Sequence, residues 1–335
     1  MNTTDFARQI HTYFTNYLPM QLNSSTNTLR SYRDVFTLLL RYCRDKRGMT
    51  VERFTLEQLS ADLVDGFLKH LEVERCCRIS TRNQRLAAIH AFVRFLQVEE
   101  PARMLQWQQI LAIPIKRMER KTPVYLEAPE LQMLLECIDA GTPAGYKDLV
   151  LLSVLYDTGA RVQEIADLCV RDVRLEHPPQ VRLTGKGRKT RVVPLMSSTA
   201  QLLVDYIDRN GLRDKPLSDQ PLFTNRQGRR YTRSGITYLV HKYVTAARST
   251  VPALPLRISP HVFRHTKAMH LLQGGVPLII IRDFLGHSDV KTSEIYARVD
   301  LEAKRKALET LIPNTPSASP SWTDDAALME WLKSL

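Results

Sequence analysis

Residue types that bind and cut anionic substrates recur in four short segments of the second half of the chain. The first segment is Thr158-Gly-Ala-Arg161, followed by Glu164. Because residues three apart share one face of a helix, Glu164 is close enough to orient the Arg161 guanidinium. Taken alone, the two residues favour a surface ion pair. The segment is nevertheless a candidate site, because Glu164 would give its arginine a fixed orientation.

The second segment is a basic turn in which Lys186 lies between Gly185 and Gly187. Glycines let a loop approach a phosphate or a base closely, and a lysine there can supply a proton as well as a charge. The turn is therefore a candidate site of acid catalysis. Its other basic residues are expected to bind phosphate through charge alone: Arg188, Lys189 and Arg191.

The third segment is His261-Val-Phe-Arg264-His265, directly after Ser259-Pro260. A polar cap followed by proline predicts the start of a helix. His261 and Arg264 would then share a face near a helix N-terminus, where the dipole favours an anion. His265 and His270 are interpreted as core or hydrogen-bonded histidines.

The fourth segment is Phe284-Leu-Gly-His287, which precedes Tyr296. The glycine is expected to close a helix, so that His287 occupies the following turn. A lone tyrosine at position 296 would ordinarily be an amphipathic core residue.

The order and spacing of these residues resemble the tyrosine recombinases, also called phage-type integrases. The resemblance covers roughly Pro123 to Ile312 by motif. The helical N-terminal part resembles the core-binding domain of that family in architecture only. Departures occur at Phe263, Lys267 and Met269, where Leu, Phe and Thr are frequent, and none of these is a chemical residue. The six matching positions are Arg161, Lys186, His261, Arg264, His287 and Tyr296.

The resemblance implies that the chain cleaves a phosphodiester without a metal ion or other cofactor. Two arginines, Arg161 and Arg264, would grip the nonbridging oxygens, and Lys186 would protonate the departing 5′-oxygen. His261 and His287 would hydrogen-bond the phosphate, with His261 the better candidate to accept the tyrosine proton. The sequence contains no P-loop pattern and no clustered carboxylates for paired Mg²⁺.

Tyr296 would be the nucleophile in this reaction. A phenol has a reference pKa of about 10, and nearby cations favour its ionised form. The implied product is a 3′-phosphotyrosine, which conserves the bond energy, so that strand joining needs no ATP.

Two other functions use the same features. A type IB topoisomerase would relax supercoils as a monomer without choosing sites, and a plasmid relaxation assay would distinguish it. A DNA-binding regulator on the same fold is also possible, but it is disfavoured because all six chemical positions carry competent residues.

The periodicity of the 335-residue chain predicts a mainly α fold with a small antiparallel β-sheet. We expect a helical core-binding, DNA-binding domain over residues 1–112, a basic interdomain linker over 113–122 and a mixed α/β catalytic domain over 123–312. A linker and a C-terminal docking helix would occupy 313–335. The expected elements of the second half are a hairpin over 181–195 and helices at 129–139, 147–158, 198–209, 232–248, 261–273 and 277–285.

Four or five helices are expected in the first domain. Ser25 should open one that Gly48 ends, and Ser60 should open the next. Basic side chains on two of the helices and in the linker are predicted to bind DNA, although solvated charge is the simpler interpretation of any one of them. They are Arg30, Arg33, Arg82, Arg85, Lys116, Arg117, Arg120 and Lys121.

Composition agrees with a DNA-binding protein, because a formal net charge of +12 attracts polyanions. The five cysteines lack zinc-site spacing and are interpreted as reduced thiols in the cytoplasm. With no secretion signal and no apolar run of membrane-spanning length, neither secretion nor membrane insertion is expected.

The expected partners are double-stranded DNA recombination sites and further copies of the chain. Residues 322–335 are predicted to form an amphipathic helix that docks on another protomer within a tetrameric synapse, with docking on its own catalytic domain as the alternative. The resemblance favours a mobile-element integrase or transposase. Transposition, phage integration and replicon resolution remain alternatives at this point, and the target sequence is not specified.

Overall fold

The structure is a computed structural model that describes residues 3–118, 123–185, 187, 189–212, 219–250, 252, 254–255, 257–286, 296 and 326–334. The chain forms two compact units, which divide between Arg120 and Lys121. Each unit has its own hydrophobic core.

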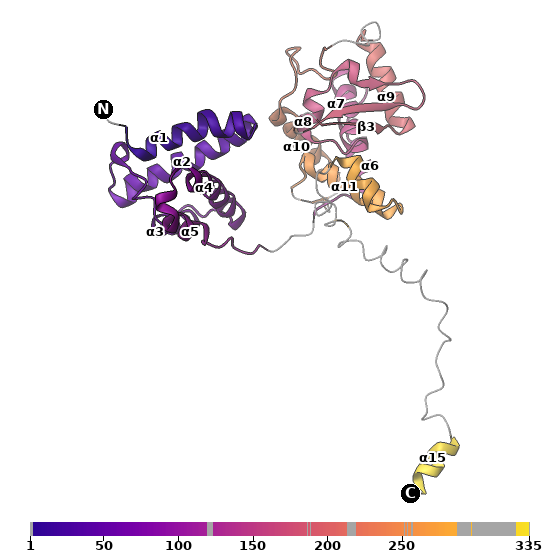
Figure 1. The fold of residues 1–335 in the computed structure, drawn as a ribbon. Coiled ribbons are helices and arrows are strands. Elements are labelled where there is room, and N and C mark those ends of the chain that lie inside the picture. The colour runs from indigo at the N-terminus through magenta and orange to yellow at the C-terminus, as the bar shows by residue number, and fades with distance from the viewer. Residues whose placement is uncertain are drawn as a thin grey trace. The chain divides into compact units, whose positions relative to one another are not determined.

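All the regular secondary structure in the described residues of unit 1 is helical, as expected (Figure 1). Its long helices bury Phe36, Phe67 and Phe92 in one core. The α-helices are α1 (Asp5–Thr12), α2 (Thr26–Arg47), α3 (Ala61–Val73), α4 (Ile79–Glu99) and α5 (Met104–Leu111).

Local chemistry sets the ends of these helices. The Ser25 hydroxyl accepts a hydrogen bond from the Thr28 amide at the start of α2, and Gly48 ends that helix with a φ of 63°. Ser60 caps α3 in the same way as Ser25. These three predicted boundaries are confirmed. A nine-residue π-helical segment, Tyr13–Gln21, continues α1 and was not expected.

Unit 2 places helices around a small antiparallel sheet (Figure 1). The predicted fold class, mainly α with a small antiparallel sheet, is therefore confirmed. The helices are α6 (Ala128–Glu136), α7 (Pro143–Asp157), α8 (Val162–Asp167), α9 (Ser197–Arg209), α10 (Arg233–Thr250), α11 (Pro260–Gln273) and α12 (Leu278–Leu285). The C-terminal helix α15 (Ala326–Lys333) lies within the predicted residues 322–335.

The sheet consists of β1 (Val173–Arg174), β2 (Gln180–Thr184) and β3 (Thr190–Pro194), in that order. The predicted hairpin is β2–β3, in which Val181 pairs with Val193. β1 was not expected, because two residues are too short for an alternating pattern. Alternate side chains of β2 enter the core, so the sheet anchors the loop that follows Thr184.

The described part of the chain contains no helix that is both long and apolar enough to cross a membrane.

Candidate active site

Arg161 lies at the junction of α7 and α8, where Gly159 turns the chain with a φ of 54°. Its guanidinium donates from Nη1 to Glu164 Oε1 at 2.9 Å, and its backbone amide donates to Glu164 Oε2 at 2.8 Å. Glu164 therefore caps α8 and orients the arginine at once, as the spacing predicted.

Glu164 also binds Arg191 from strand β3. Arg191 donates from Nη1 and Nη2 to the two carboxylate oxygens, at 2.9 and 2.8 Å, and the Glu164 side chain is only 3% exposed. Burial by itself would raise the pKa of Glu164, but hydrogen bonds and charge from Arg191, with hydrogen bonds from Arg161, lower it to about 2. One ionised carboxylate thus fixes two arginines.

Arg264 enters the same region from α11. Its Nη1 donates to the Gly159 carbonyl at 2.7 Å, and its Nη2 donates to the Leu285 carbonyl at 2.6 Å. Arg161 Nη2 donates to the next carbonyl, that of Gly286, at 3.0 Å. The last carbonyls of a helix lack partners within it. The C-terminal end of α12 therefore holds two guanidinium groups through consecutive residues.

Two glycines leave room for this arrangement. Gly286 has a φ of 64°, and a Cβ there would lie 3.0 Å from Arg191 Cδ. A Cβ at Gly185 would lie 2.9 Å from Glu164 Oε1. Any larger residue at position 185 would press on the carboxylate that orients Arg161.

The positive charges in the site affect one another. Burial, together with the charges of Arg161 and Arg191, lowers the pKa of Arg264 to about 10, while Glu164 opposes the change. His261 is exposed to solvent at its surface, but partial burial of its ring lowers its pKa. The charges of Arg264 and Arg161 act in the same direction. Several like charges close together in a partly buried site create a strong preference for a bound anion.

Tyr296 is 1% exposed and packs against α11 and α12. Its phenol oxygen lies 2.9 Å from His265 Nδ1. Burial raises the pKa of Tyr296 to about 12, and the charge of Arg264 opposes this change. The predicted hydrogen-bonded role of His265 is confirmed, but its partner could not be read from local sequence.

A buried ion pair joins the two segments that carry the arginines. Lys267 Nζ on α11 lies 3.0 Å from Asp157 Oδ1 at the end of α7. Asp157 Oδ2 also accepts the Met196 amide at 2.7 Å. Lys267 is one of the positions that depart from the family pattern, and the structure gives it a partner at Asp157.

Several predicted site residues lie outside the described residues: Lys186, His287, Arg188, Arg120 and Lys121. The structure brings Arg161, Glu164 and Arg264 together, with Tyr296 against the helix that carries Arg264.

The predicted DNA-binding residues fall into two groups. The exposed group consists of Arg30, Arg33, Lys116, Arg117 and Lys189.

The other three turn inward. Arg82 is buried, where it donates to the Pro114 carbonyl at 2.8 Å and pairs with Glu72. Arg85 is half-buried and donates to Cys77 Sγ. Arg191 is held by Glu164 and donates from Nε to the Phe284 carbonyl at 2.9 Å. Their positions favour structural roles over DNA contact.

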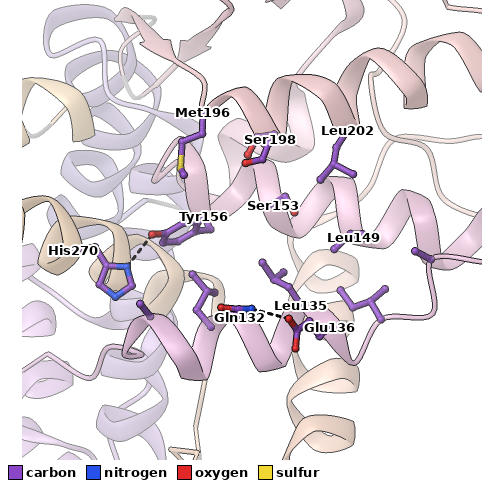
Figure 2. A pocket seen from close by; sticks show the side chains of 15 residues that line it. Gln132, Leu135, Glu136, Leu149, Ser153, Tyr156, Met196, Ser198, Leu202 and His270 are labelled. Atoms are coloured by element: carbon purple, nitrogen blue, oxygen red, sulfur yellow. Dashed lines mark hydrogen bonds between the residues drawn. The ribbon is translucent and has the colours of Figure 1, made fainter.

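Unit 2 also contains an apolar cavity of about 770 Å³ between α6, α7 and α9 (Figure 2). Leu135, Leu149 and Leu202 line it, and none of the four chemical residues that the structure describes does. At one end, the Tyr156 hydroxyl lies 2.8 Å from His270 Nδ1 (Figure 2). His270 Nε2 lies 3.0 Å from the Leu126 carbonyl. The predicted hydrogen-bonded role of His270 is confirmed.

A helical N-terminal unit and an α/β unit with clustered arginines beside a buried tyrosine define the class of protein. Residues 124–303 match the phage integrase family, and residues 12–100 match the SAM-like N-terminal domain of phage integrases. An integrase/recombinase of Sinorhizobium fredii is 35% identical over 331 residues, which cover 98% of each chain. This chain belongs to the phage integrase family, the tyrosine recombinases, and is a site-specific DNA recombinase.

Other comparisons agree with this assignment. The tyrosine recombinase XerC of Roseiflexus castenholzii is 32% identical over 312 residues, 92% of this chain and 91% of that protein. The XerH recombinase bound to difH DNA has a TM-score of 0.67 at 22% identity and covers 86% of this chain and 80% of its own. The Tn1549 transposon integrase bound to transposon right-end DNA has a TM-score of 0.69 at 16% identity, covering 89% and 98%. At these identities the two structures show a shared fold.

Proposed function

We propose that the scissile phosphate of a double-stranded DNA site binds between Arg161 and Arg264 and is attacked by Tyr296. The observation that supports this most strongly is the anchoring of both guanidinium groups by the consecutive carbonyls of Leu285 and Gly286. Two fixed cations at one helix end are suited to the two nonbridging oxygens of a phosphodiester.

In the proposed step, the Tyr296 oxygen forms a bond to phosphorus, and the bond from phosphorus to the 5′-oxygen breaks. Lys186 donates a proton to that oxygen, and His261 accepts the phenol proton. His287 donates a hydrogen bond to the phosphate. The product is a 3′-phosphotyrosine and a free 5′-hydroxyl, and attack by another 5′-hydroxyl reverses the step.

This reaction requires neither ATP nor a metal ion. The phosphotyrosine conserves the energy of the broken bond, and fixed guanidinium groups supply the positive charge that a metal would otherwise supply. The role of integrase or transposase for a mobile genetic element agrees with the names of the S. fredii and Tn1549 proteins. We place the reaction in the cytoplasm, a compartment that suits the five unpaired cysteines.

The DNA-binding surface is proposed to include unit 1 and the residues that join it to unit 2. Arg30, Arg33, Lys116 and Arg117 are exposed, and Lys189 is exposed beside the Lys186 turn. Lysine and arginine on such a surface bind phosphates and release the counterions condensed on DNA.

Recombination also requires several protomers on two DNA sites, and we propose a tetramer joined by the C-terminal tail. Helix α15 has eight residues, too few for stability in isolation, and Trp331 on it is 57% exposed. The apolar cavity between α6, α7 and α9 of another protomer offers a receiving surface for such a helix (Figure 2).

The nucleophile is tested by Tyr296→Phe on a nicked suicide substrate whose site has been selected from a random-sequence library. The wild-type protein should form an SDS-resistant adduct, whereas the variant should bind the same DNA equally well and form none. Tyr156→Phe is a matched control, because Tyr156 is also a tyrosine hydrogen-bonded to a histidine of α11. An adduct formed by Tyr296→Phe would assign the nucleophile to another residue.

A further inference from the structure

His265 has no role in the proposed cleavage chemistry, yet it contacts the nucleophile. Its Nδ1 lies 2.9 Å from the Tyr296 phenol oxygen, and the two ring centroids are 5.7 Å apart. His265 directly follows Arg264, so one turn of α11 carries both a phosphate-binding arginine and the partner of the tyrosine.

The contact holds Tyr296 where DNA cannot reach it. The residue is 1% exposed and belongs to an apolar cluster with Met269 of α11 and with Ile281 and Leu285 of α12. The phosphate of a DNA strand cannot approach a phenol that is enclosed in this way. The tyrosine must leave its place before it can attack.

We propose that His265 is a positioning residue that accepts a hydrogen bond from Tyr296 and holds the nucleophile in a buried resting position. The bond must break before cleavage. This inference rests on the proposed role of Tyr296 as the nucleophile and assigns the control of its release to a residue outside the six chemical positions.

An alternative role for His265 is that of the base that removes the phenol proton. Burial lowers the pKa of His265 to about 4, and His261 and Arg264 act in the same direction. Burial raises the pKa of Tyr296 to about 12. Both shifts favour the neutral pair over an ion pair of imidazolium and phenolate. In this position the imidazole is neutral, and the phenol keeps its proton and donates it in a hydrogen bond.

Three variants separate this contact from general packing. His265→Phe keeps an aromatic ring and removes the acceptor nitrogen. His265→Asn places an amide oxygen near the position of Nδ1 and should restore the bond. His270→Phe is the matched control. His270 also lies on α11, and the substitution removes its hydrogen bond with Tyr156.

The first measurement uses the full chain without DNA, with 3-fluorotyrosine incorporated at position 296 only. The fluorine signal of the otherwise wild-type protein should show almost no shift between H₂O and D₂O, as expected of a buried ring. His265→Phe should give a signal with the solvent shift of an exposed ring, whereas His265→Asn and His270→Phe should stay unshifted. A buried signal in His265→Phe would overturn the proposal.

The second measurement is the single-turnover rate of covalent adduct formation on the selected suicide substrate at saturating protein. Loss of one hydrogen bond that stabilises the resting position should raise this rate about 2- to 10-fold in His265→Phe, with no change in DNA affinity. His265→Asn should restore the wild-type rate. An unchanged or lower rate in His265→Phe would overturn the proposal, and a lower rate would point to His265 as a base.

The two measurements also separate this inference from the function on which it rests. The fluorine signal reports the contact whether or not Tyr296 cuts DNA. If Tyr296→Phe still forms adducts, the proposed nucleophile fails. If Tyr296→Phe is inactive and the fluorine signal remains buried in His265→Phe, only the role of His265 fails.

Discussion

Glu164→Gln should destabilise unit 2 by an amount that depends on pH. The folded protein lowers the pKa of Glu164 from 4.5 to about 2. Each pKa unit corresponds to about 1.4 kcal/mol, so ionised Glu164 stabilises the fold by about 3 kcal/mol at pH 7. The variant keeps the size of the side chain but loses the charge that holds Arg161 and Arg191.

The sign of the pH dependence follows from the direction of the shift. A carboxylate with a lowered pKa contributes its full stability above its unfolded pKa and loses it as the pH falls through the folded value. The difference in unfolding free energy between wild type and Glu164→Gln should therefore narrow from about 3 kcal/mol at pH 7 to about half of that at pH 3.

Urea denaturation followed by circular dichroism measures this difference, which should move the midpoint for unit 2 by on the order of 1 M at pH 7. The fluorescence of Trp107, fully buried in unit 1, follows the other unit in the same sample. Glu130→Gln is the matched control. Glu130 caps α6 as Glu164 caps α8, because its carboxylate accepts a hydrogen bond from the Glu127 amide at 2.8 Å. Within the described part of the chain, no arginine pairs with this carboxylate. A loss below about 1 kcal/mol, or a difference constant from pH 7 to pH 3, would refute the role assigned to Glu164.

Three further predictions test the chemistry and the assembly. Lys186→Ala should cleave ordinary DNA poorly but recover on DNA with sulfur as the 5′-bridging atom, since a thiolate leaves without a proton; equal defects on both substrates would reduce Lys186 to a phosphate ligand. Residues 123–335 alone should bind DNA more weakly than the full chain, with a shallower dependence of log affinity on log salt; an unchanged slope would argue against DNA contacts in unit 1. Deletion of residues 314–335, or Leu202→Arg in the apolar cavity, should preserve binding to one site and abolish cooperative synapsis, measured by gel shift with two DNA fragments. Wild-type cooperativity after the deletion would show that the tail does not join protomers.

Predictions from the sequence were most accurate where local chemistry decides the structure. Ser25, Ser60 and Gly48 set helix ends through hydrogen bonds to their own segments or through a positive φ, and both causes lie within a few residues. The pairing of Arg161 with Glu164 is equally local, because it spans one helical turn.

The sequence does not reveal contacts with a distant partner. DNA binding by Arg82 stays a prediction, but its side chain is buried, where it pairs with Glu72 and donates to the Pro114 carbonyl. Arg191 belongs to the basic hairpin predicted from the sequence, yet its guanidinium donates a hydrogen bond to Glu164. A charge on an amphipathic element is ordinarily solvated. Only the tertiary structure reveals a buried carboxylate within reach.

His265 illustrates a further limit. In the sequence, His265 differs from His261 and Arg264 only because it lies on another face of the helix. This position suggests a core or hydrogen-bonded residue. That description is correct, but the partner is Tyr296. The function of a buried histidine depends on what it binds. Because His265 and Tyr296 are far apart in the sequence, their contact cannot be predicted from local sequence.

The arginines and the tyrosine are therefore prepared differently for the reaction. Backbone carbonyls fix both Arg161 and Arg264, and Glu164 also holds Arg161, so the proposed phosphate binding would require little rearrangement of these groups. Tyr296 is protonated and enclosed, so its release is the step left to control. Residues 297–325 join it to α15, the helix proposed to dock on another protomer. If α15 docks on another protomer more tightly once Tyr296 has left its buried position, part of the docking energy offsets the loss of the His265 hydrogen bond and of the buried surface of Tyr296. Cleavage would then depend on assembly, because one stretch of chain joins Tyr296 to α15.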